Sequence, residues 1–353
     1  MDFKFLLVAI NAKYIHSNPA VYSLRACAGE KLRRHVELAE YTINQPMAEI
    51  LADIYARRPD AMGFSCYIWN WRLVRELLGE LPKLLPDAAI WLGGPEVSYD
   101  ADVILREYPQ VAGIMVGEGE ATFRELLDYY VKGARAARSE GEEPVAEAGS
   151  VGEGEEPVAE AGRVDMESRD EAAEGSAVAE CPCAAEEGKG RRKAGPALGL
   201  ADIPGLCLPT GYTPCRPLTD LSAIPFLYDD LAPFENRILY YETSRGCPFR
   251  CSYCLSSIDK AVRIRDMGLV EEELQFFLDH RVRQVKFIDR TFNCSHAHAM
   301  AVWTYLLKHD NGVTNFHFEI SADILREEEI ELLSRFRPGL AQMEIGVQTV
   351  NPR

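Results

Sequence analysis

The sequence contains no apolar run that approaches the ~20 residues needed to cross a bilayer as a helix. Its mean hydropathy of −0.16 agrees with the absence of a transmembrane segment. The opening segment Met1–Ile10 is too short, and has the wrong flanking residues, for a signal peptide. It is typical of a buried first strand, so we expect a cytoplasmic protein without a membrane partner.

An excess of basic residues is also missing. The chain has 38 Lys and Arg against 55 Asp and Glu, which gives a net charge of −17. Residues 140–190 account for most of it, because they hold 16 acidic and three basic residues, a net charge of −13. The rest of the chain is close to neutral, so no basic face indicates nucleic-acid binding.

The acidic segment also contains a repeat. The nonapeptide GEEPVAEAG occupies Gly141–Gly149 and recurs unchanged at Gly154–Gly162, but two copies are too few for a stacked repeat architecture. With few aromatic residues and a high charge, the segment cannot bury enough apolar surface to offset its ordering entropy. We therefore predict a disordered acidic insert over residues 133–195.

The 353 residues suggest two to three domains, and the 47% hydrophobic content is that of a globular protein. In residues 1–132, apolar runs alternate with amphipathic stretches that begin near Ala20, Met47, Asn70, Tyr99 and Glu120. The expected strands are Phe3–Ile10, Val36–Leu38, Ala61–Ser65, Ala89–Leu92 and Gly113–Val116. This alternation predicts an α/β fold with a doubly wound, Rossmann-like domain, whose ligands bind beyond the carboxyl ends of the strands.

The alternation resumes after a Pro- and Leu-rich connector at residues 196–237. The expected strands are Ile238–Thr243, Val285–Ile288, Phe316–Ile320 and Met343–Val347. The expected helices are Val270–His280, His296–Lys308 and Glu327–Phe336. Residues 238–353 therefore predict a partial (βα) barrel of the TIM type, and we expect a barrel truncated at its C-terminus.

Ten cysteines require an explanation in a cytosolic protein, where disulfides are rare. Five scattered cysteines are expected to be packing thiols, namely Cys27, Cys66, Cys207, Cys215 and Cys294. Cys181 and Cys183 in the acidic segment are interpreted as chance occurrences, with metal binding as the alternative. The other three, Cys247, Cys251 and Cys254, lie within eight residues directly after a predicted strand. Thiolates at this spacing can wrap one face of a soft-metal centre.

Three cysteines are one short of the usual four ligands of an iron–sulfur cluster, which leaves one iron open to a substrate. A structural zinc completed by Cys294 or His296 is the alternative.

The stretch Arg245–Cys254, with Tyr253 before its last cysteine, resembles the signature of the radical S-adenosylmethionine (SAM) superfamily. Because an α/β domain precedes it, the chain resembles the cobalamin-binding subgroup of these enzymes. Further similarity to the subgroup lies in Ile10–Asn18, Val116–Phe123 and Ile345–Gln348. The resemblance covers about residues 1–132 and 197–353 and leaves out the acidic insert.

The resemblance implies that Cys247, Cys251 and Cys254 hold a [4Fe–4S] cluster whose fourth iron chelates SAM. One electron from a reductase, a flavodoxin or a ferredoxin would then cleave SAM to methionine and a 5′-deoxyadenosyl radical, which attacks a small-molecule substrate. The other SAM contacts that the resemblance implies are Tyr253, Asp289, Glu319, Ser321 and Gln348. Helix capping or solvent contact is the alternative role of the polar residues at the strand ends.

The resemblance also implies a corrinoid on the strand ends of the N-terminal domain. Gly93, Gly94 and Gly117 would allow close approach, and Ser65 would contact the nucleotide tail. Tight βα turns require glycines as well, so both readings stay open.

The loop after the first strand departs from the D-x-H-x-x-G pattern of methyltransferase and mutase domains. Lys13 stands at the position of the cobalt-ligating histidine, so we expect no histidine lower ligand from this motif. His16 could substitute, although an exposed loop histidine is the plainer interpretation.

We therefore expect a cobalamin-dependent radical SAM enzyme, with methyl transfer to an unactivated carbon as the first candidate reaction. The alternative from another class is a non-enzymatic iron–sulfur or corrinoid-binding protein. An RNA methylthiotransferase ranks lower, because its N-terminal domain needs three more cluster cysteines and only Cys27 and Cys66 are present. The sequence identifies neither the substrate nor a catalytic side chain.

The disorder prediction has a direct test. Deletion of residues 140–190 should leave folding and cofactor binding intact, because the segment contributes no core. Circular dichroism and the yield of soluble protein would check this, and loss of soluble protein on deletion would refute it.

Overall fold

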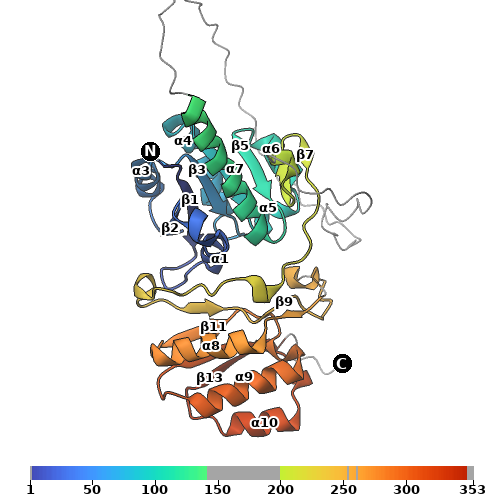
Figure 1. Ribbon diagram of the computed structural model, residues 1–353. Helices are drawn as coiled ribbons and strands as arrows, with labels where there is room; N and C mark the ends of the chain where they lie inside the picture. The colour runs from blue at the N-terminus through green and yellow to red at the C-terminus, as the bar shows by residue number, and fades with distance from the viewer. Residues whose placement is uncertain (1, 141–198, 253, 260, 348–353) are drawn as a thin grey trace, which may run out of the picture.

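The computed structural model describes residues 2–140, 199–252, 254–259 and 261–347. The two nonapeptide repeats and nearly all acidic residues of the predicted insert, together with Cys181 and Cys183, lie outside the described residues. Figure 1 shows an N-terminal α/β unit, a C-terminal α/β unit and the connector running between them. In the described part of the chain, no helix has the length and apolar character to span a membrane.

The N-terminal sheet contains five parallel strands in the order β2-β1-β3-β4-β5. They are β1 (Phe5–Asn11), β2 (Val36–Thr42), β3 (Ala61–Ser65), β4 (Ala89–Gly93) and β5 (Val111–Met115). The order reverses between β1 and β3, which makes this edge the switch point where ligands of doubly wound folds bind. The predicted fold class is confirmed.

The connector enlarges this sheet. Two short strands, β6 (Leu206–Leu208) and β7 (Gly211–Tyr212), form a hairpin that pairs antiparallel with β5, so the sheet has seven strands. The sequence analysis missed them, because strands of three and two residues are too short to show a period.

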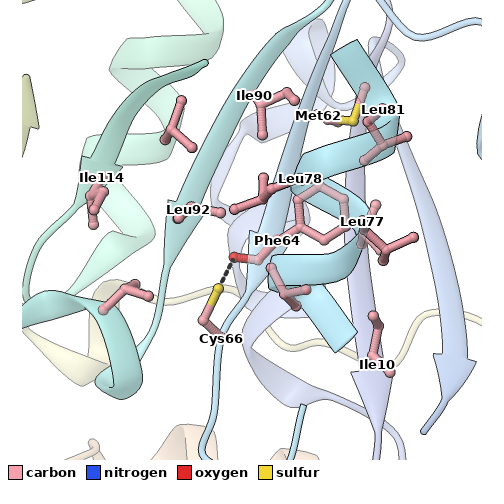
Figure 2. Packing of buried hydrophobic residues seen from close by; sticks show 14 of the residues in the cluster. Ile10, Met62, Phe64, Cys66, Leu77, Leu78, Leu81, Ile90, Leu92 and Ile114 are labelled. Atoms are coloured by element: carbon pink, nitrogen blue, oxygen red, sulfur yellow. Dashed lines mark hydrogen bonds between the residues drawn. The ribbon is translucent and has the colours of Figure 1, made fainter. Parts of the chain in front are cut away.

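Helices cover both faces of the sheet. They are α1 (Pro19–Cys27), α2 (Gly29–Arg33), α3 (Met47–Arg57), α4 (Trp71–Leu84), α5 (Pro95–Ser98), α6 (Ala101–Glu107) and α7 (Gly119–Glu140). On one face Leu77 and Leu78 of α4 pack on Phe64 and Leu92, as Figure 2 shows. On the other face Phe123 packs edge-on against Phe5. Helix α7 continues to Glu140, so residues 133–140 of the predicted insert are helical in the structure.

The C-terminal unit is a four-stranded parallel sheet in the order β13-β12-β11-β8. Its strands are β8 (Leu239–Tyr241), β11 (Gln284–Phe287), β12 (Asn315–Ile320) and β13 (Ala341–Ile345). Its helices are α8 (Met267–Asp279), α9 (His296–His309) and α10 (Glu327–Ser334). Apolar strand residues such as Val285 and Phe318 pack against these helices, and the alternate residues, such as Tyr240 and Lys286, are polar. This is the expected partial barrel.

Smaller elements join these strands and helices. A hairpin of β9 (Ser244–Arg245) and β10 (Arg263–Ile264) encloses the cysteine segment. Single 3₁₀ turns occur at Leu200–Asp202, Leu221–Ala223, Ala232–Phe234, Leu255–Ser257, Phe292–Cys294 and Ala322–Ile324.

The two units meet where the loop after β1 lies beside β8. The Ile238 N–H donates to the Ile15 carbonyl at 2.9 Å, and the Ser17 hydroxyl donates to the Ile238 carbonyl at 3.2 Å. His16 Nδ1 lies 2.5 Å from the Tyr240 hydroxyl. The carboxyl edge of the first sheet therefore borders the first strand of the partial barrel.

Two glycines on this edge allow a stability test. Gly94 has φ +108°, and a Cβ there would lie 2.5 Å from the Cys66 carbonyl oxygen, whereas Gly117 has φ +77° and nothing within 4 Å of its Cβ position. Gly94→Ala should cost roughly 2–4 kcal/mol of unfolding free energy from strain and overlap, and Gly117→Ala about 1 kcal/mol from strain alone. Urea unfolding followed by tryptophan fluorescence would measure both. Equal losses of unfolding free energy in the two variants would contradict the close packing of Gly94 on the Cys66 backbone.

Candidate functional site

The three cysteines lie on one loop that leaves the β8–β9 strand end. Cys247 is buried, whereas Cys251 and Cys254 are exposed. The Cys247 N–H donates to the Asp259 carbonyl at 3.0 Å, and the Cys254 N–H donates to the Cys251 carbonyl at 3.1 Å. Before Cys247, Gly246 has φ +98°, and a Cβ there would lie 2.5 Å from the Ala261 carbonyl oxygen. The start of the loop therefore packs closely on the backbone of Asp259 and Ala261.

The donor set of this loop fits an iron–sulfur cluster, because three thiols close in sequence are soft ligands. Within the described residues, no three His, Cys, Asp or Glu side chains already converge on a metal-binding point. Cys247, Cys251 and Cys254 would supply the three thiolates that hold such a cluster. Of the two residues in the zinc alternative, His296 has its two ring nitrogens 3.0 Å from Glu328 and Glu329.

Asp289 follows β11 and is fully buried. Its carboxylate accepts hydrogen bonds from the Thr243 N–H at 2.9 Å, the Thr243 hydroxyl at 2.7 Å and the Ser244 hydroxyl at 2.6 Å. Burial raises the pKa of Asp289 to about 7, although these three hydrogen bonds oppose the shift. Thr243 and Ser244 immediately precede the cysteine loop, so Asp289 fixes the strand end from which the loop starts. Its contact with SAM stays a prediction.

His298 on α9 completes this buried group. Its Nε2 lies 2.8 Å from the Thr243 hydroxyl, and burial lowers the pKa of His298 to about 4. The imidazole is therefore neutral at pH 7 and can accept or donate a hydrogen bond without adding charge beside Asp289.

The structure brings Glu319 and Ser321 to the end of β12, next to Asp289 at the end of β11. Glu319 pairs with Lys286 Nζ at 3.1 Å, and the Ser321 hydroxyl donates to Asp323 at 2.6 Å. The contacts of Glu319 and Ser321 with SAM stay predictions. Tyr253 and Gln348 lie outside the described residues.

On the N-terminal sheet, the Ser65 hydroxyl accepts a hydrogen bond from Asn18 Nδ2 at 3.2 Å. A Cβ at Gly93 would make only ordinary contacts with Met115, and the conformation of Gly94 is explained by its packing on Cys66. Gly117 differs, because it is exposed and the space on its Cβ side is open. The Gly117 backbone is therefore accessible, and the corrinoid contacts of Ser65, Gly93, Gly94 and Gly117 stay predictions.

His16 is not the exposed loop histidine of the plainer interpretation. It is half-buried and bonded to Tyr240, and burial followed by the charges of Lys13 and Lys286 lowers its pKa. Cys27 and Cys66 behave as the packing thiols expected, since burial raises their pKa values to about 11 and about 12.

The sequence analysis missed an apolar group directly after β3. The rings of Tyr67 and Trp69 stack with centroids 4.4 Å apart, and Trp69 Nε1 donates to the Ile10 carbonyl at 3.3 Å. Ile68 between them is 81% exposed. Aromatic residues immediately beyond a buried strand were the available signal. Exposed apolar side chains at a switch point suit a large, partly apolar ligand.

It also missed an ion-pair network between the units. Arg245 contacts Glu118 at 3.3 Å, Glu120 at 2.8 Å and Glu242 at 2.7 Å. Arg263 contacts Glu118 and Asp259, each at 2.6 Å. The only local signal was the Gly-Glu-Gly-Glu run at residues 117–120.

Comparison with known families matches both units. Residues 6–127 match the B12 binding domain, and residues 241–353 match the radical SAM superfamily. The chain is a radical SAM protein with a B12-binding domain. The residues matched include β1–β5 in one unit and the three-cysteine loop in the other, as the sequence resemblance implied.

Curated relatives of this radical SAM protein are methyltransferases by name. One is the 2-(S-pantetheinyl)-carbapenam-3-carboxylate methyltransferase of Streptantibioticus cattleyicolor, 25% identical over 294 residues, which are 83% of this chain and 34% of that protein. Another is the cobalamin-dependent radical SAM methyltransferase TokK of Streptomyces tokunonensis, 24% identical over 69% of this chain and 30% of that protein. The chain thus spans about a third of their length.

Two solved structures share the fold of this radical SAM protein. OxsB with aqua-cobalamin and SAM bound gives a TM-score of 0.64 at 16% identity, over 98% of this chain and 44% of that one. TsrM from Kitasatospora setae with cobalamin and a [4Fe–4S] cluster gives 0.63 at 17% identity, over 100% of this chain and 62% of that one. These likenesses confirm the arrangement of a B12-type domain beside a partial radical SAM barrel.

The raised pKa of Asp289 predicts a pH dependence. Native Asp289 takes up a proton below about pH 7, while the unfolded carboxyl stays ionised down to about 3.9. The native state therefore binds more protons between these values, and this group's contribution to stability falls as pH rises from 4 to 7. Asp289→Asn removes this contribution.

The measurement is urea unfolding of both proteins from pH 4.5 to 7.5. The stability of the Asn variant relative to wild type should rise with pH, by at most about 1.4 kcal/mol per pH unit. His298, whose pKa is lowered, contributes an opposite pH dependence to the stability of both proteins. Subtracting one unfolding free energy from the other cancels that contribution. Parallel stability curves would show that Asp289 is ionised throughout.

Proposed function

We propose that this chain is the cobalamin- and cluster-binding part of a radical SAM methyltransferase that acts on a small molecule. The observation that carries the proposal is the position of Cys247, Cys251 and Cys254. Their loop starts where the first strand of the partial barrel ends, close to the carboxyl edge of the B12-type sheet. The names of the curated relatives support methyl transfer as the reaction class.

When bound, the cluster and SAM supply a 5′-deoxyadenosyl radical, and methylcobalamin supplies a methyl group. The residues of the chain bind and orient these groups. Cys247, Cys251 and Cys254 would ligate three irons and leave the fourth for SAM. Asp289, through Thr243 and Ser244, keeps the start of the loop in place.

The small-molecule substrate is proposed to lie against the polar face of the second sheet, opposite the helices. Tyr240, Lys286, His317 and Glu319 alternate there with the apolar residues that pack on α8 and α9. Lys286 pairs with Glu319 at 3.1 Å and with Glu344 at 2.9 Å. This face offers ionic and hydrogen-bonding groups to a polar substrate, whereas the opposite face is fully packed.

We also propose an electron donor and a cellular location for the protein. An external reductase, flavodoxin or ferredoxin would deliver the electron, since radical SAM chemistry begins with a one-electron reduction. We place the protein in the cytoplasm, where thiols such as the exposed Cys251 remain reduced.

The test is anaerobic reconstitution with iron and sulfide, followed by reduction and addition of SAM. Wild type should form 5′-deoxyadenosine, and Cys247→Ala, Cys251→Ala and Cys254→Ala should each reduce it to the level without protein, because each removes a cluster ligand. Liquid chromatography with mass spectrometry quantifies the product, and iron and sulfide assays quantify the cluster.

Cys215→Ala is the matched control, since Cys215 is also exposed but lies on the connector. It should retain the full iron content and the full yield of 5′-deoxyadenosine. A wild-type cluster that yields no 5′-deoxyadenosine would favour the alternative, a non-enzymatic cluster- and corrinoid-binding protein. Cluster formation that survives all three substitutions would overturn the site itself.

A further inference from the structure

Glu118, directly after Gly117, is the centre of the ion-pair network between the two units. Its carboxylate accepts two hydrogen bonds from Arg263, at 2.6 and 3.1 Å, and one from the Thr219 N–H at 2.6 Å. Burial disfavours the charge, but these donors and nearby Arg245 still lower the pKa of Glu118 to about 2. The side chain is only 17% exposed, so a charged group of the B12-binding domain is held inside a contact with the radical SAM domain.

Both arginines that hold Glu118 lead directly to Cys247. Arg263 also binds the Asp259 carboxylate, and the Asp259 carbonyl accepts the Cys247 N–H at 3.0 Å. Arg245 is separated from Cys247 only by Gly246, which packs so closely on the Ala261 backbone that a Cβ there would overlap it. The position of the cysteine loop is thus tied to the position of Glu118 by two routes.

On its other side, Glu118 is tied to the candidate corrinoid site. Gly117 is exposed, has φ +77° and faces open space, whereas the residue after it is fixed by the network. A ligand that contacts the Gly117 backbone must therefore fit the position that Glu118 and its two arginines impose.

We propose that Glu118 is a positioning residue that couples cobalamin binding to cluster binding. The inference rests on the proposed function, since it requires both cofactors. Loading the cluster further restrains the loop that begins at Cys247, and the contacts of Arg245 and Arg263 with Glu118 transmit this restraint to the Gly117 backbone. Cobalamin then meets a site that is already ordered and binds more tightly, and by linkage cobalamin strengthens cluster binding by the same factor.

The experiment measures the dissociation constant of hydroxocobalamin on the full chain, before and after cluster reconstitution, by anaerobic absorbance titration. Wild type should bind at least about fivefold more tightly with the cluster present, the lower end of typical coupling between sites. Glu118→Gln should reduce this ratio to within about twofold of one. With excess reductant, hydroxocobalamin is reduced to cob(II)alamin; after subtraction of the cob(II)alamin signal, the electron paramagnetic resonance signal of the reduced cluster should change on adding the corrinoid in wild type and not in Glu118→Gln.

Glu125→Gln is the matched control, because it neutralises another α7-region carboxylate whose partner, Arg216 at 2.8 Å, lies on the connector. It should keep the wild-type coupling. Arg263→Lys retains the charge but loses the paired hydrogen bonds to Glu118, so it should give an intermediate ratio. It also carries the test if circular dichroism shows that Glu118→Gln is unfolded.

The outcomes separate the two proposals. If wild type binds neither cofactor, the proposed function fails and the coupling with it. If wild type binds both with independent affinities, or if Glu118→Gln keeps the full ratio and the spectral change, the coupling is wrong and the proposed function stands.

Discussion

Strand β8 is held at both of its ends by the loops of the N-terminal sheet, and the candidate site depends on that placement. At its start, Ile238 pairs with the loop after β1, and just beyond its end Arg245 pairs with Glu120 after β5. An extended strand advances by about 3.3 Å per residue and bends little, so fixing both ends sets its direction. The cysteine loop that follows Arg245 therefore lies at the carboxyl edge of the N-terminal sheet, near the loops after β1 and β5.

The sequence predicted the parallel strands of both sheets to within a few residues, because strands in the interior of a sheet have distinctive apolar runs. All seven residues of β1 are buried, and a strand buried on both faces reads as a continuous apolar run. The end of α7 was misplaced because its last turns, from Gly133 to Glu140, carry no apolar period, although Ala and Arg there favour a helix. The β6–β7 hairpin was missed because its pairing with β5 is a tertiary contact that a three-residue strand does not reveal.

In the candidate site, too, features that are local in the sequence were predicted and contacts between distant residues were not. Cys247, Cys251 and Cys254 are close in sequence, so their spacing alone indicated a common ligand. Glu118 and Arg263 are 145 residues apart, and no local pattern relates a carboxylate to a guanidinium at that separation. Glycine identity was also insufficient, because Gly94 and Gly117 look alike in sequence. Only the structure distinguishes them, because a Cβ at Gly94 would overlap the Cys66 backbone and a Cβ at Gly117 would meet open space.

The buried Asp289 and the largely buried Glu118, both beside the cysteine loop, have opposite pKa shifts, and their donors explain the difference. Asp289 receives hydrogen bonds from a backbone N–H and two hydroxyls, which do not offset the loss of hydration. Glu118 receives them from a guanidinium, whose positive charge does offset it. Asp289 can therefore hold the strand end geometrically and shed its charge on protonation, whereas Glu118 needs its charge to hold Arg245 and Arg263. The loop of three thiols is thus anchored on one side by hydrogen bonds from uncharged donors and on the other by an ion pair that persists throughout the neutral pH range.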